Sequence, residues 1–340
     1  MKKYILATLA AGVMMAAGVA QAPAVELTLS HWVPPTHPLQ PQGMEPWAES
    51  IRKATEGRVD IKIYPASQLG AAPDHYDMAR DGVVDIGFVN PGYQPGRFPI
   101  LAAGELPFHV SNAKSGSRAL HQWYLQYAEK EMSDVKVCLV HLHDPGTLHG
   151  KTGPLLMPTD FAGKNIRPAH GTLARAVNLM GGASVQVPAP AMRDALSKGT
   201  ADVTASPWGS LFIFGAQDLV KHHLDIPLYV TTFVFAMNKD KLASLSEADR
   251  KVMEDHCTPE WSEKMASGWA DAEASGRGKI AAMEGHVMYA PNAEQLAVWK
   301  QTMQPLVDEW KANAAKTGID AEAGYADLIE TLKANNAYVE

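Results

Sequence analysis

Polar and aromatic side chains follow two short β-strand patterns that lie far apart in the chain. Asn90 and Tyr93 come after the first pattern, at residues 85–89, and Ser206 and Trp208 come after the second. In α/β proteins, ligands bind in the crevice outside the carboxyl ends of the strands. The Asn90 amide can donate a hydrogen bond to a ligand hydroxyl or oxo group, although asparagine also forms turns at such places. These two loops therefore indicate a shared binding cleft.

No pattern in the sequence supplies a catalytic centre or a metal site. There is no G-x-S-x-G elbow, no P-loop, no H-E-x-x-H and no G-x-G-x-x-G after a strand. His141 and His143 alternate on a strand pattern and His222 and His223 are adjacent, but none has a companion cysteine or carboxylate at a ligand spacing. We therefore expect no catalytic residues, no metal and no cofactor.

The two candidate loops end two similar stretches of sequence. In each stretch a helical run ends at a glycine, Gly82 or Gly199, and a short strand and a proline-marked loop follow. Glycine suits the left-handed position after a helix. A β-rich segment precedes each helix, at residues 59–64 and 183–187, and completes a βαβ unit. This pattern predicts an α/β fold with two similar lobes, although helix, glycine and strand also succeed one another in other α/β proteins.

The first 24 residues have the pattern of a secretory signal peptide. Lys2 and Lys3 form a charged region, residues 5–19 an apolar region, and an A-x-A site ends at Ala24. We expect cleavage near Ala24 and a periplasmic location. The apolar run is too short to be a stable membrane anchor, so we expect no direct membrane insertion.

The charge balance argues against nucleic acid as a partner. The chain has 37 acidic against 30 basic side chains, a net charge of -7, and no basic run. An acidic protein that binds an anion must concentrate positive potential at a few residues.

Two β-rich runs and one long helical run are expected to connect the lobes. Residues 135–143 predict a crossover strand, and residues 228–237 predict a return crossover. Residues 246–284 predict one long helix that spans both lobes, opened by an N-cap box at Ser246. The expected division is a signal peptide at 1–24, lobe I at 25–143 plus 232–272, and lobe II at 144–231 plus 273–340.

The chain has two cysteines, Cys138 and Cys257. In an oxidising compartment they can form a disulfide, or they can remain two buried free thiols. Both alternatives stay open at the level of sequence.

Four short motifs occur in an order that is typical of one family. They are residues 64–70 (YPASQLG), Gly82-x-x-Asp85, residues 106–108 (LPF) and residues 163–168 (GKNIRP). Over the whole mature chain, the sequence resembles the periplasmic solute-binding subunits of TRAP transporters, the DctP type. The resemblance implies a two-lobed periplasmic-binding-protein-like fold with crossover strands and a long lobe-spanning helix. It also implies an organic-acid ligand enclosed between the lobes and delivery to a sodium-driven membrane permease.

The resemblance assigns ligand binding to the arginine of the GKNIRP motif, Arg167. A guanidinium is always charged and offers two parallel donors, so it can hold a carboxylate in one orientation. A structural salt bridge is the alternative role. Many members have a second arginine after the first crossover, but here Thr147 and His149 are the nearest polar substitutes. The position where relatives often have asparagine is Ser206, and Trp208 could form an aromatic wall. These departures favour a ligand with one principal carboxylate.

The resemblance also brings other residues toward the cleft. His31 and Trp32 end the first strand pattern, in a loop that lines the cleft in relatives. His170 follows Arg167 where relatives often have a polar contact. Tyr76 opens a helix of the first lobe and is either a ligand contact or a buried packing residue.

Other functions remain as alternatives. One is an ABC-type or receptor-linked periplasmic binding protein, and a less favoured one is a secreted enzyme that acts on an organic acid. The enzyme would need a nucleophile with a base, or an acid with a base, and no motif supplies such a pair.

Overall fold

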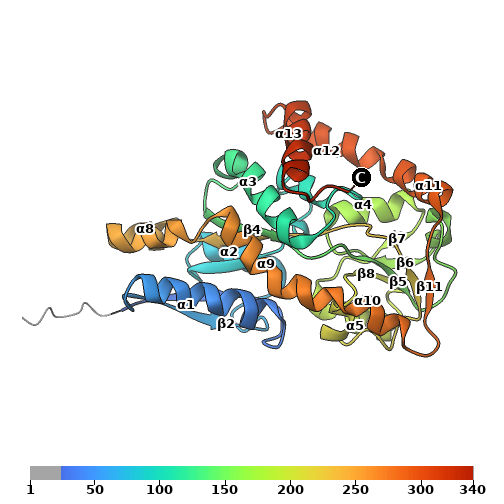
Figure 1. Cartoon of the computed structure of the whole chain (residues 1–340), viewed down its shortest axis with the longest axis horizontal. Coiled ribbons are helices and arrows are strands. Elements are labelled where there is room, and N and C mark those ends of the chain that lie inside the picture. Colours follow the sequence, from blue (N-terminus) through green and yellow to red (C-terminus); the bar gives the residue numbers. More distant parts are fainter. Residues whose placement is uncertain (1–23, 340) are drawn as a thin grey trace, which may run out of the picture.

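The protein has two β-sheets, one in each lobe, and helices cover both (Figure 1). The computed structural model describes residues 24–339 of the 340-residue sequence. The signal peptide predicted at 1–24 therefore lies almost entirely outside the described residues. The first sheet has the strand order β2-β1-β3-β10-β4, and the second has the order β11-β9-β5-β8-β6-β7. This arrangement confirms the predicted two-lobed α/β fold. The strands are β1 (Val25–Ser30), β2 (Val59–Tyr64), β3 (Ile86–Val89), β4 (Lys136–Leu142), β5 (Thr147–Gly150), β6 (Asn165–Arg167), β7 (Ala183–Ser184), β8 (Val203–Ser206), β9 (His222–Leu224), β10 (Thr232–Met237) and β11 (Val287–Tyr289).

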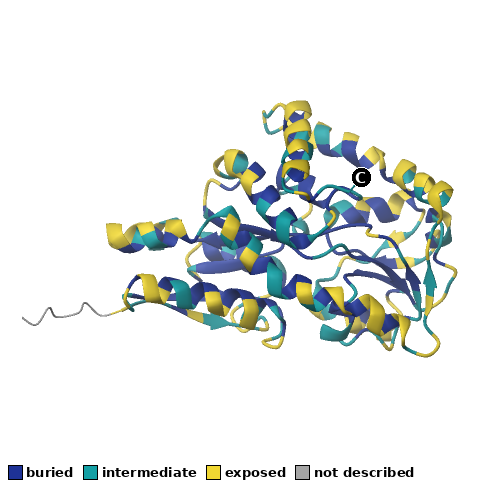
Figure 2. Ribbon diagram, viewed as in Figure 1, coloured by how far each residue is buried: buried dark blue, intermediate teal, exposed yellow. Residues whose placement is uncertain are grey.

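The helices pack on the outer faces of the sheets, and their exposed sides face solvent (Figure 2). Strands β3, β4, β5, β8 and β10 are almost entirely buried, as expected where a sheet is covered on both faces, whereas the edge strands β2, β7 and β11 are partly exposed. The α-helices are α1 (Glu45–Ala54), α2 (His75–Arg80), α3 (Ala113–Glu131), α4 (Gly171–Leu179), α5 (Met192–Ser197), α6 (Ser210–Ile213), α7 (Lys239–Ser244), α8 (Glu247–Asp255), α9 (Pro259–Ala274), α10 (Gly276–Ala281), α11 (Ala293–Met303), α12 (Pro305–Ala315) and α13 (Ala321–Ala334).

The similarity between the two stretches of sequence is also a similarity of structure. In the first sheet β1 lies between β2 and β3, all parallel, and in the second β6 lies in the same way between β7 and β8. An antiparallel strand follows in each case, β10 beside β3 and β5 beside β8. Gly82 and Gly199, which end the helical runs, have φ angles of 72° and 75°. Only glycine adopts this left-handed conformation without strain, which is why the pattern was readable from sequence.

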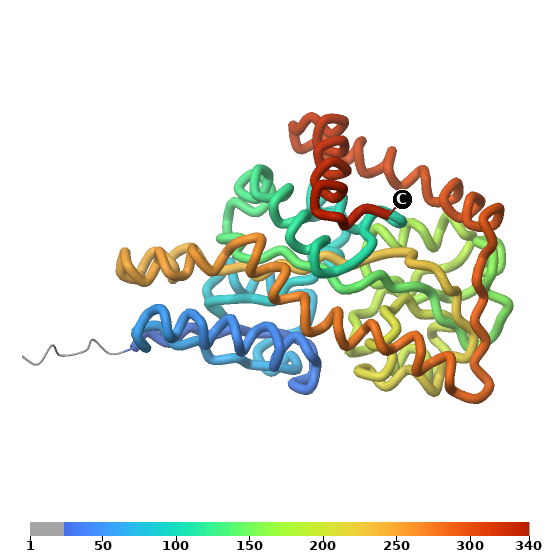
Figure 3. The backbone as a smooth tube through the Cα atoms, viewed as in Figure 1, coloured from blue at the N-terminus to red at the C-terminus, as the bar shows by residue number. Residues whose placement is uncertain are grey.

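Three segments cross between the lobes, as Figure 3 shows. One leads from β4 to β5, and another leads from β9 to β10. The two pair through an antiparallel bridge between Gly146 and Tyr229. The third is the pair α9 and α10, which runs across the molecule from the first sheet to the second. The predicted crossover strands are therefore present.

The single long helix predicted at residues 246–284 is three helices, α8, α9 and α10. Thr258 caps α9 by accepting a hydrogen bond from the Trp261 amide at 3.3 Å, and Pro259 is the first residue of α9. Proline cannot continue a preceding helix, because it lacks an N–H and its ring clashes with the previous turn. The prediction treated Pro259 as a bend, whereas it starts a new helix. In the same way, Pro305 separates α11 from α12.

The carboxyl-terminal helices contact both lobes. The α11 helix lies against α4, whereas α13 packs against α3 beside the first sheet. The Trp123 indole of α3 donates to the Gly324 carbonyl of α13 at 2.9 Å, and Tyr338 forms a β-bridge with Val110. The assignment of residues 273–340 to lobe II stays a prediction, and this packing attaches part of that segment to the first lobe.

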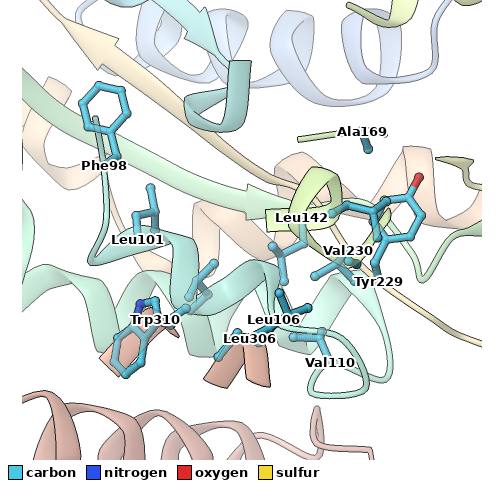
Figure 4. Packing of buried hydrophobic residues seen from close by; sticks show 14 of the residues in the cluster. Phe98, Leu101, Leu106, Val110, Leu142, Ala169, Tyr229, Val230, Leu306 and Trp310 are labelled. Carbon is cyan, nitrogen blue, oxygen red and sulfur yellow. The ribbon is translucent and has the colours of Figure 1, made fainter. Parts of the chain in front are cut away.

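One large hydrophobic cluster runs between the lobes, and Figure 4 shows part of it. Leu106 and Val110 pack there against Leu142 of β4 and Val230 of the return crossover, with Trp310 of α12 nearby. Burial of such side chains is the main favourable contribution to folding. The crossing segments are therefore anchored in the core on both sides of the interface.

Cys138 of β4 and Cys257, which precedes α9, form a disulfide. The structure thus answers the question that the sequence left open. The bridge attaches the turn between α8 and α9 to the first sheet. Within residues 24–339, no helix has the length and apolar character needed to cross a membrane.

A candidate ligand cavity between the lobes

A small cavity lies where the ends of β1, β3, β6 and β8 meet the crossing segments. Its volume is about 40 Å³, close to the share of one or two water molecules. A ligand the size of a six-membered ring needs more room, so its entry requires the lobes or the lining side chains to move outward. The lining residues are Trp32, Val33, His37, Asn90, Tyr93, His143, Arg167, Ala169, Ala189, Met192, Ala205, Ser206, Pro207, Ser210, Phe214, Tyr229, Thr231, Phe233 and Trp269.

Arg167 ends β6 and is only 3% exposed. Its Nε donates to the Val187 carbonyl and its Nη1 to the Ala205 carbonyl, each at 3.0 Å. These bonds fix the guanidinium plane but use only two of its five N–H groups. Within residues 24–339, no carboxylate lies within ion-pair distance of it. A buried cation without a countercharge is costly, so this site favours an anion.

Three other side chains present hydrogen-bond donors to the same cavity. The Asn90 Oδ1 accepts from the Gly92 amide at 3.0 Å, while Nδ2 has only a long 3.5 Å contact to the Ala169 carbonyl. The Tyr93 hydroxyl oxygen accepts from the Ala189 amide at 2.9 Å, so its hydrogen is free to donate. Tyr229 provides a third donor. Together with Arg167, these donors again suit an anion.

The Tyr229 hydroxyl is buried and has no hydrogen-bond partner among the described residues. In Figure 4 it points away from Val230 and Val110, out of the packed cluster. Burial raises the pKa of Tyr229 far above its usual value, although the charge of Arg167 opposes this shift. The hydroxyl therefore keeps its proton and can donate it to a ligand that is bound to Arg167.

Aromatic rings form the remaining wall of the cavity. The ring centroid of Trp32 lies 5.6 Å from that of Tyr93 and 6.3 Å from that of Phe233, and Phe233 lies 5.4 Å from Trp269. The Trp32 indole is fixed by a 3.1 Å hydrogen bond to the Phe88 carbonyl. A planar apolar group can pack against such rings through stacked or edge-to-face contacts.

Five of the residues that the sequence indicated line this cavity: Trp32, Asn90, Tyr93, Arg167 and Ser206. Ser206 has a different hydrogen bond from the one expected, because its hydroxyl donates to the Pro207 carbonyl at 2.9 Å. It therefore offers the cavity only lone pairs, which do not suit a carboxylate. Binding by these residues stays a prediction.

The other indicated residues of the first lobe have partners away from the cavity lining. His31 pairs with Gln40 at 3.0 Å, and burial lowers its pKa to about 4. The Tyr76 hydroxyl donates to Asp134, and neither residue lines the cavity, which agrees with the alternative role of Tyr76 in packing.

His170 also lies outside the lining of this cavity. Its Nδ1 accepts from the Leu173 amide at 3.1 Å, so it caps the start of α4. Its Nε2 donates to the Val230 carbonyl at 3.1 Å.

The substitutes proposed for a second arginine also turn away from the cavity. Thr147 and His149 are two residues apart on β5 and share one face. Thr147 donates to the Leu224 carbonyl at 2.7 Å, and His149 is 2.8 Å from His223. Trp208 packs edge-on against His149, with ring centroids 4.8 Å apart. The expected aromatic wall is present, but other rings form it.

Several lining residues were not singled out from the sequence. They come from the crossing segments, from α6 and from α9, where a side chain's direction depends on how the lobes meet. One of them, His37, could have been noticed in the sequence, because it lies in the loop HWVPPTHP only six residues after the candidate His31. The residues concerned are His37, His143, Ser210, Phe214, Phe233 and Trp269.

Glu273 of α9 forms hydrogen bonds with residues that line the cavity. Its carboxylate accepts hydrogen bonds from the amides of Gly209 and Ser210, from the Ser210 hydroxyl and, at 2.8 Å, from the Trp269 indole. Ser210 and Trp269 both line the cavity, so Glu273 holds α9 of the crossing segment against α6 of the second lobe.

The buried Glu273 predicts a pH-dependent stability. Burial raises its pKa from 4.5 to about 6, so the folded protein holds this proton more tightly than the unfolded chain does. The free energy of unfolding should therefore fall by about 2 kcal/mol as the pH rises from about 4.5 to above 6. Subtracting the urea-unfolding profile of Glu273→Gln from that of the wild type isolates this change. A flat difference profile across that window would contradict the assignment.

A larger hollow, of about 690 Å³, lies between residues 91–99, α4 and α12. Its lysine, Lys316, is exposed to solvent and donates to the Asn313 side-chain oxygen at 2.9 Å, and its other charged groups have partners. Arg175 bonds Glu309 at 2.9 Å, and Glu105 accepts from Thr172 and Thr232 at 2.9 and 3.0 Å. The smaller cavity, with an arginine that lacks a countercharge, is therefore the better candidate for an anionic ligand.

Two α/β lobes joined by crossing segments, with a small cavity between them, are typical of solute-binding proteins. The sequence matches the family model for DctP, bacterial extracellular solute-binding protein family 7, over residues 29–313, and the chain belongs to this family. The members of this family are binding proteins rather than enzymes. Membership confirms the resemblance to TRAP subunits and supports that interpretation rather than the ABC-type or enzyme alternatives.

Three solved TRAP solute-binding proteins have closely similar structures. The protein from Rhodoferax ferrireducens, solved with copurified benzoate, is 29% identical with a TM-score of 0.86, covering 92% of this chain and 99% of that one. The one from Bordetella bronchiseptica, with bound (R)- and (S)-mandelate, is 31% identical with a TM-score of 0.86 and coverages of 91% and 99%. One from a marine metagenome, with 3-hydroxybenzoate, is 30% identical with a TM-score of 0.86 and coverages of 93% and 100%.

Proposed function

We propose that this protein binds an aromatic monocarboxylate between its lobes and delivers it to the membrane permease of a TRAP transporter. The observation that carries the proposal is Arg167, a buried guanidinium without a countercharge, in a cavity walled by aromatic rings. Arg167 and the Tyr229 hydroxyl would bind the carboxylate, and Tyr93 and Asn90 would supply further donors. Trp32, Phe233 and Trp269 would enclose the ring.

The relatives support the aromatic part of this proposal. The three similar structures hold benzoate, mandelate and 3-hydroxybenzoate. All three ligands combine one carboxylate with a six-membered ring, which is the combination that a single arginine and several aromatic side chains would suit. The sequence departures noted above, with no second arginine after the first crossover, point in the same direction.

Binding is coupled to closure of the lobes in this proposal. Arg167 is on the second sheet, whereas Trp32, Asn90 and Tyr93 follow strands of the first. A ligand that touches both sets favours the closed arrangement by its differential affinity for that state. Export to the periplasm with cleavage near Ala24, and transfer of an unchanged ligand to a sodium-driven permease, complete the function. No catalytic step is part of it.

A ligand screen tests this function. We expect benzoate, 3-hydroxybenzoate and mandelate to raise the melting temperature by several degrees at saturating concentration, because a ligand that binds only the folded state stabilises it by mass action. Benzamide is the matched neutral control and should give no shift. Glucuronate and pyroglutamate test other acids, and calorimetry ranks the affinities. Tighter binding of a sugar acid than of every aromatic acid would contradict the proposal.

A further inference from the structure

His37 lies fully buried in the loop after β1 and has an unused hydrogen-bond donor. Its Nδ1 accepts a hydrogen bond from the Leu39 amide at 3.1 Å, so Nδ1 carries no proton. Burial, together with the neighbouring His31, His141 and His143, lowers the pKa of His37 to about 3, and the ring is neutral. The proton of a neutral ring must then be on Nε2. Within residues 24–339, Nε2 has no hydrogen-bond partner.

The free edge of this imidazole belongs to the proposed ligand cavity. His37 lines the cavity, and its ring stands edge-on to Trp269 with centroids 4.7 Å apart. Because Nδ1 is bonded to the backbone of its own loop, Nε2 is on the side of the ring that faces away from that loop. Buried polar groups almost always have a partner, so an unused donor in a ligand cavity points to an acceptor on the ligand.

His37 and Arg167 come from different lobes, since one follows β1 and the other ends β6. Arg167, Tyr229, Tyr93 and Asn90 already offer the carboxylate several donors, so a further oxygen elsewhere on the ligand is the acceptor that best matches the unused donor of His37. The surroundings of His37 are neutral, because His31, His141 and His143 are buried and have lowered pKa values. A neutral oxygen suits this position better than a second carboxylate, which would need a cation.

We propose that the His37 Nε2 donates a hydrogen bond to a hydroxyl or oxo oxygen on the ring of the bound aromatic acid. This inference rests on the proposed function and adds the substrate class, oxygen-substituted aromatic acids. His37 is then a specificity-determining residue: it discriminates the substituted acid from the unsubstituted one. The same contact links the ligand to the first lobe and so favours closure.

Calorimetry with matched ligands tests the inference. The set is benzoate, the three hydroxybenzoates, the three methylbenzoates and isophthalate. We expect one hydroxybenzoate to bind the wild type at least about tenfold more tightly than its methyl analogue, which fills the same space without the acceptor. His37→Phe should bring this ratio close to one and change the affinity for benzoate less than threefold. His37→Gln, which retains a side-chain N–H donor, should keep part of the ratio.

His141→Phe is the control variant. His141 is also a buried imidazole that has no hydrogen-bond partner in the part of the chain that the structure describes. Its ring stacks on Phe233 with centroids 5.2 Å apart, but it is not part of the cavity lining. It should leave the ratio unchanged. Melting curves without ligand verify that each variant is folded.

The outcomes separate this inference from the function on which it rests. If benzoate binds and needs Arg167, but no hydroxybenzoate exceeds its methyl analogue, the role of His37 is wrong and the proposed function stands. A ratio that persists in His37→Phe also overturns the role. Preference for isophthalate overturns the choice of a neutral oxygen. If no aromatic acid binds at all, the function itself is wrong.

Discussion

Replacing Arg167 by alanine is expected to weaken carboxylate binding by about 30-fold to several thousand-fold. Truncating one partner of a buried, hydrogen-bonded charge pair costs about 2–5 kcal/mol, and each 1.4 kcal/mol is a factor of ten in affinity. The effect should be near the upper end, because the guanidinium is held by Val187 and Ala205 before the ligand arrives and loses little entropy on binding. Calorimetric titration with benzoate measures it directly.

Two further variants make this test specific. Arg167→Lys keeps the positive charge but not the planar pair of donors, so its affinity should lie between those of the wild type and Arg167→Ala. Arg175→Ala removes an arginine whose side chain is 57% exposed and pairs with Glu309 on the surface. It should bind the ligand as the wild type does. An affinity of Arg167→Ala within about threefold of the wild type would remove Arg167 from the site.

Loss of the disulfide is expected to have the largest effect on stability. Cys138 and Cys257 are separated by 119 residues, so the bridge closes a long loop and restricts the unfolded chain strongly. Changing both residues to alanine should lower the free energy of unfolding by about 2–4 kcal/mol. Urea unfolding without ligand measures the difference, and the double variant avoids the single thiol that could link two molecules.

A reducing agent provides the control for that prediction. It should shift the urea midpoint of the wild type toward that of the Cys138→Ala/Cys257→Ala variant and leave the midpoint of the variant unchanged. Affinity for benzoate should change little, because neither cysteine lines the cavity. Equal midpoints for the oxidised wild type and the variant would mean that the bridge does not stabilise the fold.

Local chain chemistry explains which parts of the fold could be predicted from sequence. Gly82 and Gly199 could be recognised as the ends of helices, because few residues other than glycine adopt a positive φ at the position after a helix. The division of residues 246–284 into three helices was missed, although Pro259 was visible, because a proline can bend a helix or begin one. Which of these occurs depends on the capping contact of Thr258 and on packing against α3, and neither is local information.

The cavity was predictable only where a side chain follows directly from a strand end. Asn90 directly follows β3, so the strand pattern located it, whereas Arg167 at the end of β6 was assigned by its place in the family motif GKNIRP. Thr147 and His149 failed because their direction depends on which face of β5 turns outward, and a shift of one residue reverses it. Trp269 reaches the cavity through a crossing segment, whose course is set by how two separate sheets dock.

The division of the ligand contacts between two sheets has an evolutionary consequence. In the proposed function, the guanidinium that holds the acid belongs to the second sheet, while Trp32 and His37, which would contact the ring and its substituent, follow a strand of the first. On this proposal, substitutions in the loop after β1 change which ring is accepted and leave Arg167, which holds the acid, in place. Related binding proteins can therefore acquire different ligand specificities through changes in one lobe alone.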